Sequence, residues 1–386
     1  MKKLILIFSL CAACTNMSEQ GFTNKAEAKN EIVNNHKEGK WFEYMDSAYH
    51  ITKDTNAPYY SLIVYKEGKR DGIVRTYSKN GKLYKESPYH DGKGNGVNRL
   101  YYESGKLRGY VTVKDGERNG TEKLYFASGE PLCEILYKDD KRQGLETYFF
   151  ENGKIANVVN YIDDKKNGME KGYYESGNIR REVPYVNGKK RGTGKLYYEN
   201  GALQETTNFS DDKRNGIAKF YYESGKVHEE KPYSNDKGDG ITKLYYESGR
   251  IKEEIPYTNG KKNGIVKWYY VSGRMRGKNV YTNGNVVARK YYDEKGKVVI
   301  NGELKGYFEN GKLEDEIQII NGKEDGLEKG YYESGQILYE KPMIGGKENG
   351  VEKEFYENGK VKCEKTYSQD TVVVTKFYDE SGNEIK

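Results

Sequence analysis

The residues best suited to chemistry form a repeated pair of a cation and an aromatic ring. A lysine is followed two residues later by a tyrosine, and the pair recurs every 24 residues. Such a stripe could bind an acidic protein partner, lipid head groups or glycans through charge and cation–π contacts. The candidate residues are Lys171, Tyr173, Lys195, Tyr197, Lys219, Tyr221, Lys243, Tyr245, Lys267 and Tyr269.

The same stripe also has a purely structural explanation. Across a β-hairpin, a lysine can pair with the carboxylate opposite to it, and the sequence offers Lys219 with Glu229 and Lys243 with Glu253. Cross-strand pairing would account for a repeated residue without any ligand. We therefore favour structural pairing as the explanation of the stripe, with ligand binding as the alternative. If the chain binds a protein partner, we expect the binding surface to be distributed over the repeats rather than confined to the irregular segment 284–302.

Enzymatic chemistry has little support in the sequence. The four histidines, His36, His50, His90 and His228, show no metal-ligand spacing from one another. No Gly-x-Ser-x-Gly nucleophile elbow and no phosphate-binding loop is present. Carboxylates recur in every repeat, whereas an active site needs a unique arrangement. We expect no enzyme, no metal and no cofactor.

The N-terminus resembles a bacterial lipoprotein signal. Lys2 and Lys3 precede a short apolar run, and Cys11-Ala-Ala-Cys14 supplies small residues before a cysteine, although Cys11 stands where leucine is usual. This resemblance implies a signal peptide at 1–13, lipidation of Cys14 and a location at a membrane surface of the cell envelope. The alternative is an ordinary hydrophobic N-terminus on a cytoplasmic protein. The net charge of +6, with both signs interspersed, argues against a nucleic-acid partner.

The elements that position these residues are set by a strict repeat. Glycines recur every 24 residues from Gly72 to Gly264, a period typical of a repeat array. We expect a flexible tether over 14–38, an N-terminal cap or degenerate repeat over 39–71, and the array over 72–386. The period breaks once, which makes the segment 284–302 irregular.

Each repeat predicts a β-hairpin, because two runs of about eight residues are separated by Glu-Ser-Gly or Asn-Gly turns. With Glu247-Ser248-Gly249 as a three-residue loop, alternation would place one apolar set on the core face and Tyr246 on the wetter face. That core set is Ile241, Tyr245, Ile251, Ile255 and Tyr257, with Met169 in the equivalent position of an earlier repeat. The expected fold is all-β: an elongated array of antiparallel hairpins in an open, curled or half-pipe sheet.

The phrase Gly-x-x-Lys-x-Tyr-Tyr-Glu-Ser-Gly-Lys-Leu, followed by Tyr-x-Asn-Gly-Lys-x-Asn-Gly, resembles the variant MORN repeat (membrane occupation and recognition nexus). It is similar especially to the bacterial group known as YwqK-family antitoxins. The resemblance implies a non-enzymatic scaffold that binds a protein or lipid partner. The YwqK-type likeness implies, as an alternative, an antitoxin or immunity protein that neutralises a partner toxin.

Overall fold

The computed structural model describes residues 21–385, so the predicted signal peptide and Cys14 lie outside the described residues. The described chain is built from β-strands and one short 3-10 helix, η1 (Lys25–Glu27), and these residues contain no α-helix. None of their elements is a helix long and apolar enough to cross a membrane. The expected all-β fold of antiparallel hairpins is confirmed.

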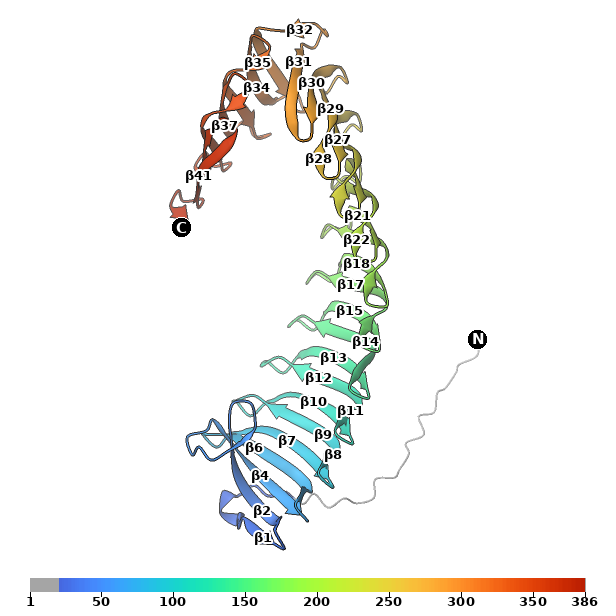
Figure 1. Cartoon of the computed structure of the whole chain (residues 1–386), viewed down its shortest axis with the longest axis vertical. Helices are drawn as coiled ribbons and strands as arrows, with labels where there is room; N and C mark the ends of the chain where they lie inside the picture. The colour runs from blue at the N-terminus through green and yellow to red at the C-terminus, as the bar shows by residue number, and fades with distance from the viewer. Residues whose placement is uncertain (1–20, 386) are drawn as a thin grey trace, which may run out of the picture. The chain divides into compact units, whose positions relative to one another are not determined.

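The chain divides into two compact units, which are described separately. The first extends to Asn178 and includes Tyr185–Gly188; the second comprises Ile179–Pro184 and the residues from Lys189 onward. The strands of the first unit are β1 (Glu31–Val33), β2 (His36–Met45), β3 (Ile51–Thr52), β4 (Tyr59–Lys66), β5 (Lys69–Arg70), β6 (Gly72–Ser78), β7 (Leu83–His90), β8 (Lys93–Gly94), β9 (Gly96–Tyr101), β10 (Leu107–Lys114), β11 (Glu117–Arg118), β12 (Gly120–Tyr125), β13 (Pro131–Lys138), β14 (Lys141–Phe149), β15 (Ile155–Ile162), β16 (Lys165–Lys166) and β17 (Gly168–Tyr173). Figure 1 shows these hairpins following one another side by side from β4 to β17.

The second unit continues the same pattern, and its strands belong to two sheets; the last two residues of its first strand, Tyr185 and Val186, are counted with the first unit. The strands of the first of these sheets are β18 (Ile179–Val186), β19 (Lys189–Lys190), β20 (Gly192–Tyr197), β21 (Leu203–Ser210), β22 (Lys213–Arg214), β23 (Gly216–Tyr221), β24 (Val227–Ser234), β25 (Lys237–Gly238), β26 (Gly240–Tyr245), β27 (Ile251–Thr258), β28 (Lys261–Lys262), β29 (Gly264–Tyr269), β30 (Met275–Thr282), β31 (Asn285–Tyr292) and β32 (Val298–Val299). Those of the other sheet are β33 (Gly302–Tyr307), β34 (Leu313–Ile320), β35 (Lys323–Glu324), β36 (Gly326–Tyr331), β37 (Ile337–Ile344), β38 (Lys347–Glu348), β39 (Gly350–Phe355), β40 (Val361–Ser368), β41 (Thr371–Tyr378) and β42 (Glu384–Ile385).

One repeat illustrates how the sequence forms a hairpin. The Tyr246 amide donates to the carbonyl of Arg250 at 2.9 Å, and the Gly249 amide donates to the carbonyl of Tyr246 at 2.9 Å. Gly249 has a φ of +88°, a left-handed conformation that glycine adopts without the Cβ penalty of other residues. Tyr245 then pairs with Ile251, as the loop length predicts.

Beyond that pair, the predicted register is wrong by one residue. The ladder shifts between Leu244 and Tyr245, so that Lys243 pairs with Glu254 rather than Glu253. Ile241 accordingly lies opposite Pro256, not Ile255. A β-bulge adds one residue to one strand, and a one-residue slip moves every later side chain to the other face.

The bulge also corrects the predicted core face. Thr242 (2% exposed) and Ile255 (8%) lie on the buried side, here called the inner face, whereas Ile241 is 52% exposed on the opposite, outer face. Tyr246, predicted to be on the wetter face, is only 8% exposed. Its hydroxyl donates to the Tyr269 carbonyl of the next hairpin at 2.7 Å, so this ring links neighbouring repeats.

The core is correspondingly thin and divided into small clusters. One comprises Cys133, Ile135 and Tyr137, with Leu124 packed against them. Cations cover the inner-face rings, and the Arg118 guanidinium lies 4.0 Å from the centroid of Tyr137. Such cation–π contacts stabilise a sheet face that lacks a second apolar layer.

The predicted tether is wrong for residues 21–38. Strand β1 pairs antiparallel with β2, and Phe22 is only 4% exposed. The Asn30 side-chain oxygen accepts a hydrogen bond from the Phe42 amide at 2.8 Å. These contacts occupy the backbone edge of β2, so residues 21–38 form part of the N-terminal cap.

The irregular segment 284–302 marks the change from one sheet to the next within the second unit. The sheet that contains β18 to β31 ends at β32, and β33 starts the other sheet. Tyr291, Leu304 and Ile319 form a buried cluster there, each at most 3% exposed. The break in the sequence period therefore corresponds to a packed corner between two sheets.

Candidate functional site

The cation-and-ring stripe lies on the outer face, where glutamates connect its members. Glu230 on β24 forms an ion pair with Lys219 at 2.8 Å within its own hairpin. The same carboxylate accepts a hydrogen bond from the Tyr245 hydroxyl of the next hairpin at 2.9 Å. This outer-face glutamate thus binds a lysine and a tyrosine at once.

The pattern repeats one hairpin further along the second unit. Glu254 lies opposite Lys243 in its own hairpin and opposite Lys267 in the next. It forms an ion pair with Lys267 at 3.2 Å and accepts a hydrogen bond from Tyr269 at 3.0 Å. Lysines and glutamates therefore alternate across successive strands and largely neutralise one another, which supports the structural explanation of the stripe with the partner residue corrected by one position.

The electrostatics of this network agree with its geometry. The ammonium of Lys219, followed by the hydroxyl of Tyr245, lowers the pKa of Glu230 below its ordinary value. Burial, and then the hydrogen bond to Glu230, raise the pKa of Tyr245 to about 12. At neutral pH the carboxylate is charged and the phenol is neutral, so the tyrosine acts as a donor.

The remaining stripe residues differ in their partners and in their exposure. In the second unit, Tyr197 donates to Glu182 at 2.9 Å. Lys195 is exposed and lies opposite Thr206 in its own hairpin and opposite Glu182 on the preceding strand. Tyr221 is partly buried on β23. Lys171 and Tyr173 lie on β17 in the first unit and are partly buried.

Sequence reasoning missed a row of exposed aliphatic side chains on the same face. In the second unit this row comprises Ile217 (48% exposed), Ile241 (52%) and Ile265 (45%), at the same position of consecutive hairpins. Leu145 (60%) and Met169 (43%) occupy that position in the first unit. Ile241 and Met169 were expected in the core, and the two-sided apolar pattern of the strands was the only signal that they could be exposed.

The described residues offer little for catalysis. Residues 21–385 contain no group of three or more His, Cys, Asp or Glu side chains that could hold a metal ion. Cys133 and Cys363 are free and buried, and burial raises the pKa of the Cys133 thiol to about 11, so this thiol is protonated at neutral pH.

The family comparison agrees with the repeat geometry. The model described as "MORN repeat variant" matches residues 70–91, 95–115, 118–139, 142–163, 166–187, 190–211, 214–235, 238–259, 300–321, 324–344 and 348–369. The unmatched gap between 259 and 300 contains the hairpin before the corner and most of the irregular segment. No curated protein matches the chain.

Solved structures that resemble the chain are much larger. The crystal structure of TcdB2-TccC3 is 13% identical with a TM-score of 0.16, and the match covers 84% of this chain and 20% of that one. The Tc holotoxin pore of Photorhabdus luminescens is 14% identical with a TM-score of 0.12, covering 84% and 21%. The chain thus spans about one fifth of the length of these structures. Because its family-model matches cover more than half of the sequence, the chain belongs to the MORN repeat variant family.

Proposed function

We propose that the chain is a non-enzymatic scaffold that binds a protein partner along its outer face. The observation that carries this proposal is the row of Ile217, Ile241 and Ile265, each close to half exposed and in register. Contiguous apolar groups on a protein surface commonly mark interaction sites. Lys219, Lys243 and their glutamates border the row, which gives an apolar centre with a polar rim.

The alternating charges favour a protein over an anionic lipid surface. A lipid-binding face needs unneutralised cations, whereas Glu230 and Glu254 bind the lysines and tyrosines of this face. Complete burial of an isoleucine contributes about 1.5–3 kcal/mol, so each half-exposed side chain could add about 1 kcal/mol on binding. Three such residues would strengthen binding by about 3 kcal/mol, or more than about 100-fold.

The test uses the full chain as bait in its native cell extract, with bound proteins identified by cross-linking through the outer-face lysines. The variant replaces Ile217, Ile241 and Ile265 together by threonine, which Thr193 already provides at the same repeat position. The control replaces Ile320 and Ile344, which are 42% and 55% exposed at the ends of their strands. Loss of the partner from the triple variant alone supports the proposal; equal capture by both variants contradicts it.

The proposal includes a lipid on Cys14 that holds the scaffold at a membrane surface of the cell envelope. Its support is the signal-like sequence before that cysteine. Cys14→Ser should release the protein from the membrane fraction, whereas Cys11→Ser should leave it attached. Equal partitioning of both variants would refute the anchor. Recovery of a toxin as the captured partner would identify the role as that of a YwqK-type antitoxin.

A further inference from the structure

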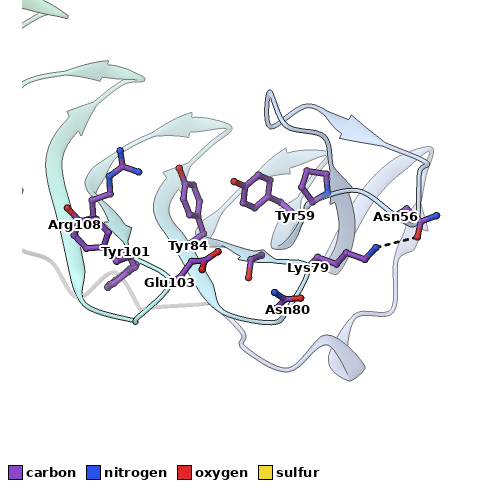
Figure 2. A pocket seen from close by; sticks show the side chains of 11 residues that line it. Asn56, Tyr59, Lys79, Asn80, Tyr84, Tyr101, Glu103 and Arg108 are labelled. Atoms are coloured by element: carbon purple, nitrogen blue, oxygen red, sulfur yellow. Dashed lines mark hydrogen bonds between the residues drawn. The ribbon is translucent and has the colours of Figure 1, made fainter. Parts of the chain in front are cut away.

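A hollow in the first unit is unrelated to the outer-face row. It has a volume of about 580 Å³ and lies where the long connection between β2 and β4 approaches the turns after β6 and β9. The residues that line it are Asn56, Pro58, Tyr59, Ser78, Lys79, Asn80, Tyr84, Tyr101, Tyr102, Glu103 and Arg108. Figure 2 shows Tyr59 and Tyr84 side by side along it, with Arg108 beyond Tyr84 and Asn56 at the opposite end.

The hollow exists because the repeat departs from its pattern at one residue. The position held by Ser78 carries an aromatic ring in each of the next eight repeats, from Tyr102 to Tyr270. The Tyr102 hydroxyl, for example, donates to the Tyr125 carbonyl of the following hairpin at 2.6 Å. Serine cannot occupy that volume, so the space that a ring would occupy is left open beside β7.

Two of the rings that line the hollow, Tyr59 and Tyr84, are not part of the repeat pattern. Tyr84 occupies a position that holds Arg108 and Gln204 in other repeats. Its ring centroid lies 5.1 Å from that of Tyr59 and 5.6 Å from that of Tyr49, which stacks on it at 13°. Tyr49 and Tyr59 come from the N-terminal cap, so this aromatic cluster is an addition to the basic fold.

The connection that completes the hollow is held by its own hydrogen bonds. The Asp46 carboxylate accepts from the amides of Ala48 and His50 at 2.8 and 2.9 Å. At its far end, Lys79 donates to the Asn56 side-chain oxygen at 3.4 Å. These hydrogen bonds fix the wall of the hollow.

We propose that this hollow binds an oligosaccharide. Flat aromatic faces stack against the C–H faces of sugar rings, and amide, carboxylate and guanidinium groups exchange hydrogen bonds with sugar hydroxyls. Four of the eleven lining residues carry such groups, namely Asn56, Asn80, Glu103 and Arg108, and Ser78 and Lys79 add a hydroxyl and an ammonium. A groove for a proline-rich peptide would instead be mainly aromatic with few polar groups. The volume lies within the range of about 300–1,000 Å³ for small-ligand sites, which suits two or three linked sugars.

Tyr101 and Tyr102 serve as fixed walls of the site. The Tyr101 hydroxyl donates to Glu86 at 2.8 Å, and the Tyr102 hydroxyl donates to the next hairpin, so hydrogen bonds within the protein hold both rings. The Arg108 guanidinium lies 5.9 Å from the Tyr102 ring centroid, and its donors are available to vicinal hydroxyls at that end.

The experiment titrates the full chain with chitotriose, maltotriose, cellotriose and xylotriose, using saturation-transfer NMR and calorimetry. Binding of at least one trisaccharide with a Kd of about 1 mM or tighter is expected. Ser78→Tyr restores the ring of the other repeats, and Tyr84→Arg installs the residue of the next repeat, so neither should disturb folding. Each should weaken binding at least about tenfold, as expected where buried contact groups dominate affinity.

Gln204→Ala, at the position equivalent to Tyr84 in the second unit, is the matched control and should bind like the unmodified chain. The proposal is overturned if none of the four sugars binds at a sugar concentration of about ten times that Kd. It is also overturned if Ser78→Tyr binds the sugar as tightly as the unmodified chain. A decaproline peptide that binds while the sugars do not would overturn it in favour of a peptide site. Retained sugar binding by the isoleucine triple variant would show that this site is independent of the outer-face row.

Discussion

Replacing Asp315 by asparagine should open the corner between the two sheets of the second unit. The Arg276 guanidinium on β30 donates through Nη1 to the Asp315 carboxylate on β34 at 2.8 Å, and through Nη2 to its other oxygen. Arg276 is 8% exposed, and its Nε has no hydrogen-bond partner among the described residues. Burial acts to lower the pKa of Arg276, but Asp315 overcomes this effect and raises it, so the cation persists.

The expected loss follows from leaving that cation buried without a counter-charge. Breaking a buried ion pair by removing one partner costs about 3–5 kcal/mol. Replacing both partners by apolar residues of similar size is often neutral or stabilising, so Arg276→Met combined with Asp315→Leu should recover most of the loss. The Tyr246 and Tyr270 rings lie close enough to influence the pKa of Arg276 and offer apolar contacts to the methionine.

Hydrogen exchange followed by mass spectrometry is the suitable assay, because a repeat array opens locally rather than in one step. A loss of about 3 kcal/mol corresponds to a protection decrease of more than about 100-fold in peptides from β30 and β34. Peptides from β12 to β14 in the first unit serve as the internal control. A decrease of less than about threefold in Asp315→Asn, or a double variant as damaged as the single one, would refute the reasoning.

Three further outcomes are expected. Tyr246→Phe should lower hydrogen-exchange protection in the following hairpin about fivefold, because a buried hydrogen bond contributes about 1 kcal/mol. Tyr245→Phe, on the more exposed face, should have a smaller effect. The reverse order of the two effects would contradict the observed faces. Burial raises the pKa of Glu324, so its ionised form destabilises the corner and the stability of the fold should decrease as pH rises above about 4.5. Glu324→Gln should reduce this decrease in melting curves recorded at different pH values. A pH profile unchanged by Glu324→Gln would contradict this assignment. Gly264→Ala should lower the free energy of unfolding in urea by about 1–3 kcal/mol, because φ of Gly264 is +115° and the new Cβ would lie 3.1 Å from Pro256. A decrease below about 0.5 kcal/mol would show that the backbone relaxes.

The sequence by itself determined the local architecture. The 24-residue period, the glycine turns and the paired strand-like runs predicted antiparallel hairpins, and even the pairing of Tyr245 with Ile251 next to the turn. These features depend on residues close together in the chain, where turn chemistry and alternation act directly. The family assignment has the same basis, because the repeated phrase is itself local.

Only the tertiary structure decided which face is buried. The bulge beside Leu244 shifts the ladder by one residue, which moves Ile241 to the outer face and brings Thr242 beside Ile255 on the inner face. Strands with apolar residues on both sides do not specify this register, because either face can be buried at similar cost. Sequence reasoning therefore found the stripe but paired its lysines with glutamates one residue away from the actual partners. It also missed the row of exposed isoleucines.

Contacts between distant segments were equally inaccessible to sequence reasoning. Arg276 and Asp315 are 39 residues apart and meet only because β33 begins a second sheet. The hollow beside Ser78 needs the connection between β2 and β4, which lies outside the regular period. A repeat predicts what its members share, whereas these two sites arise where the repeat is interrupted and side chains from different segments pack together.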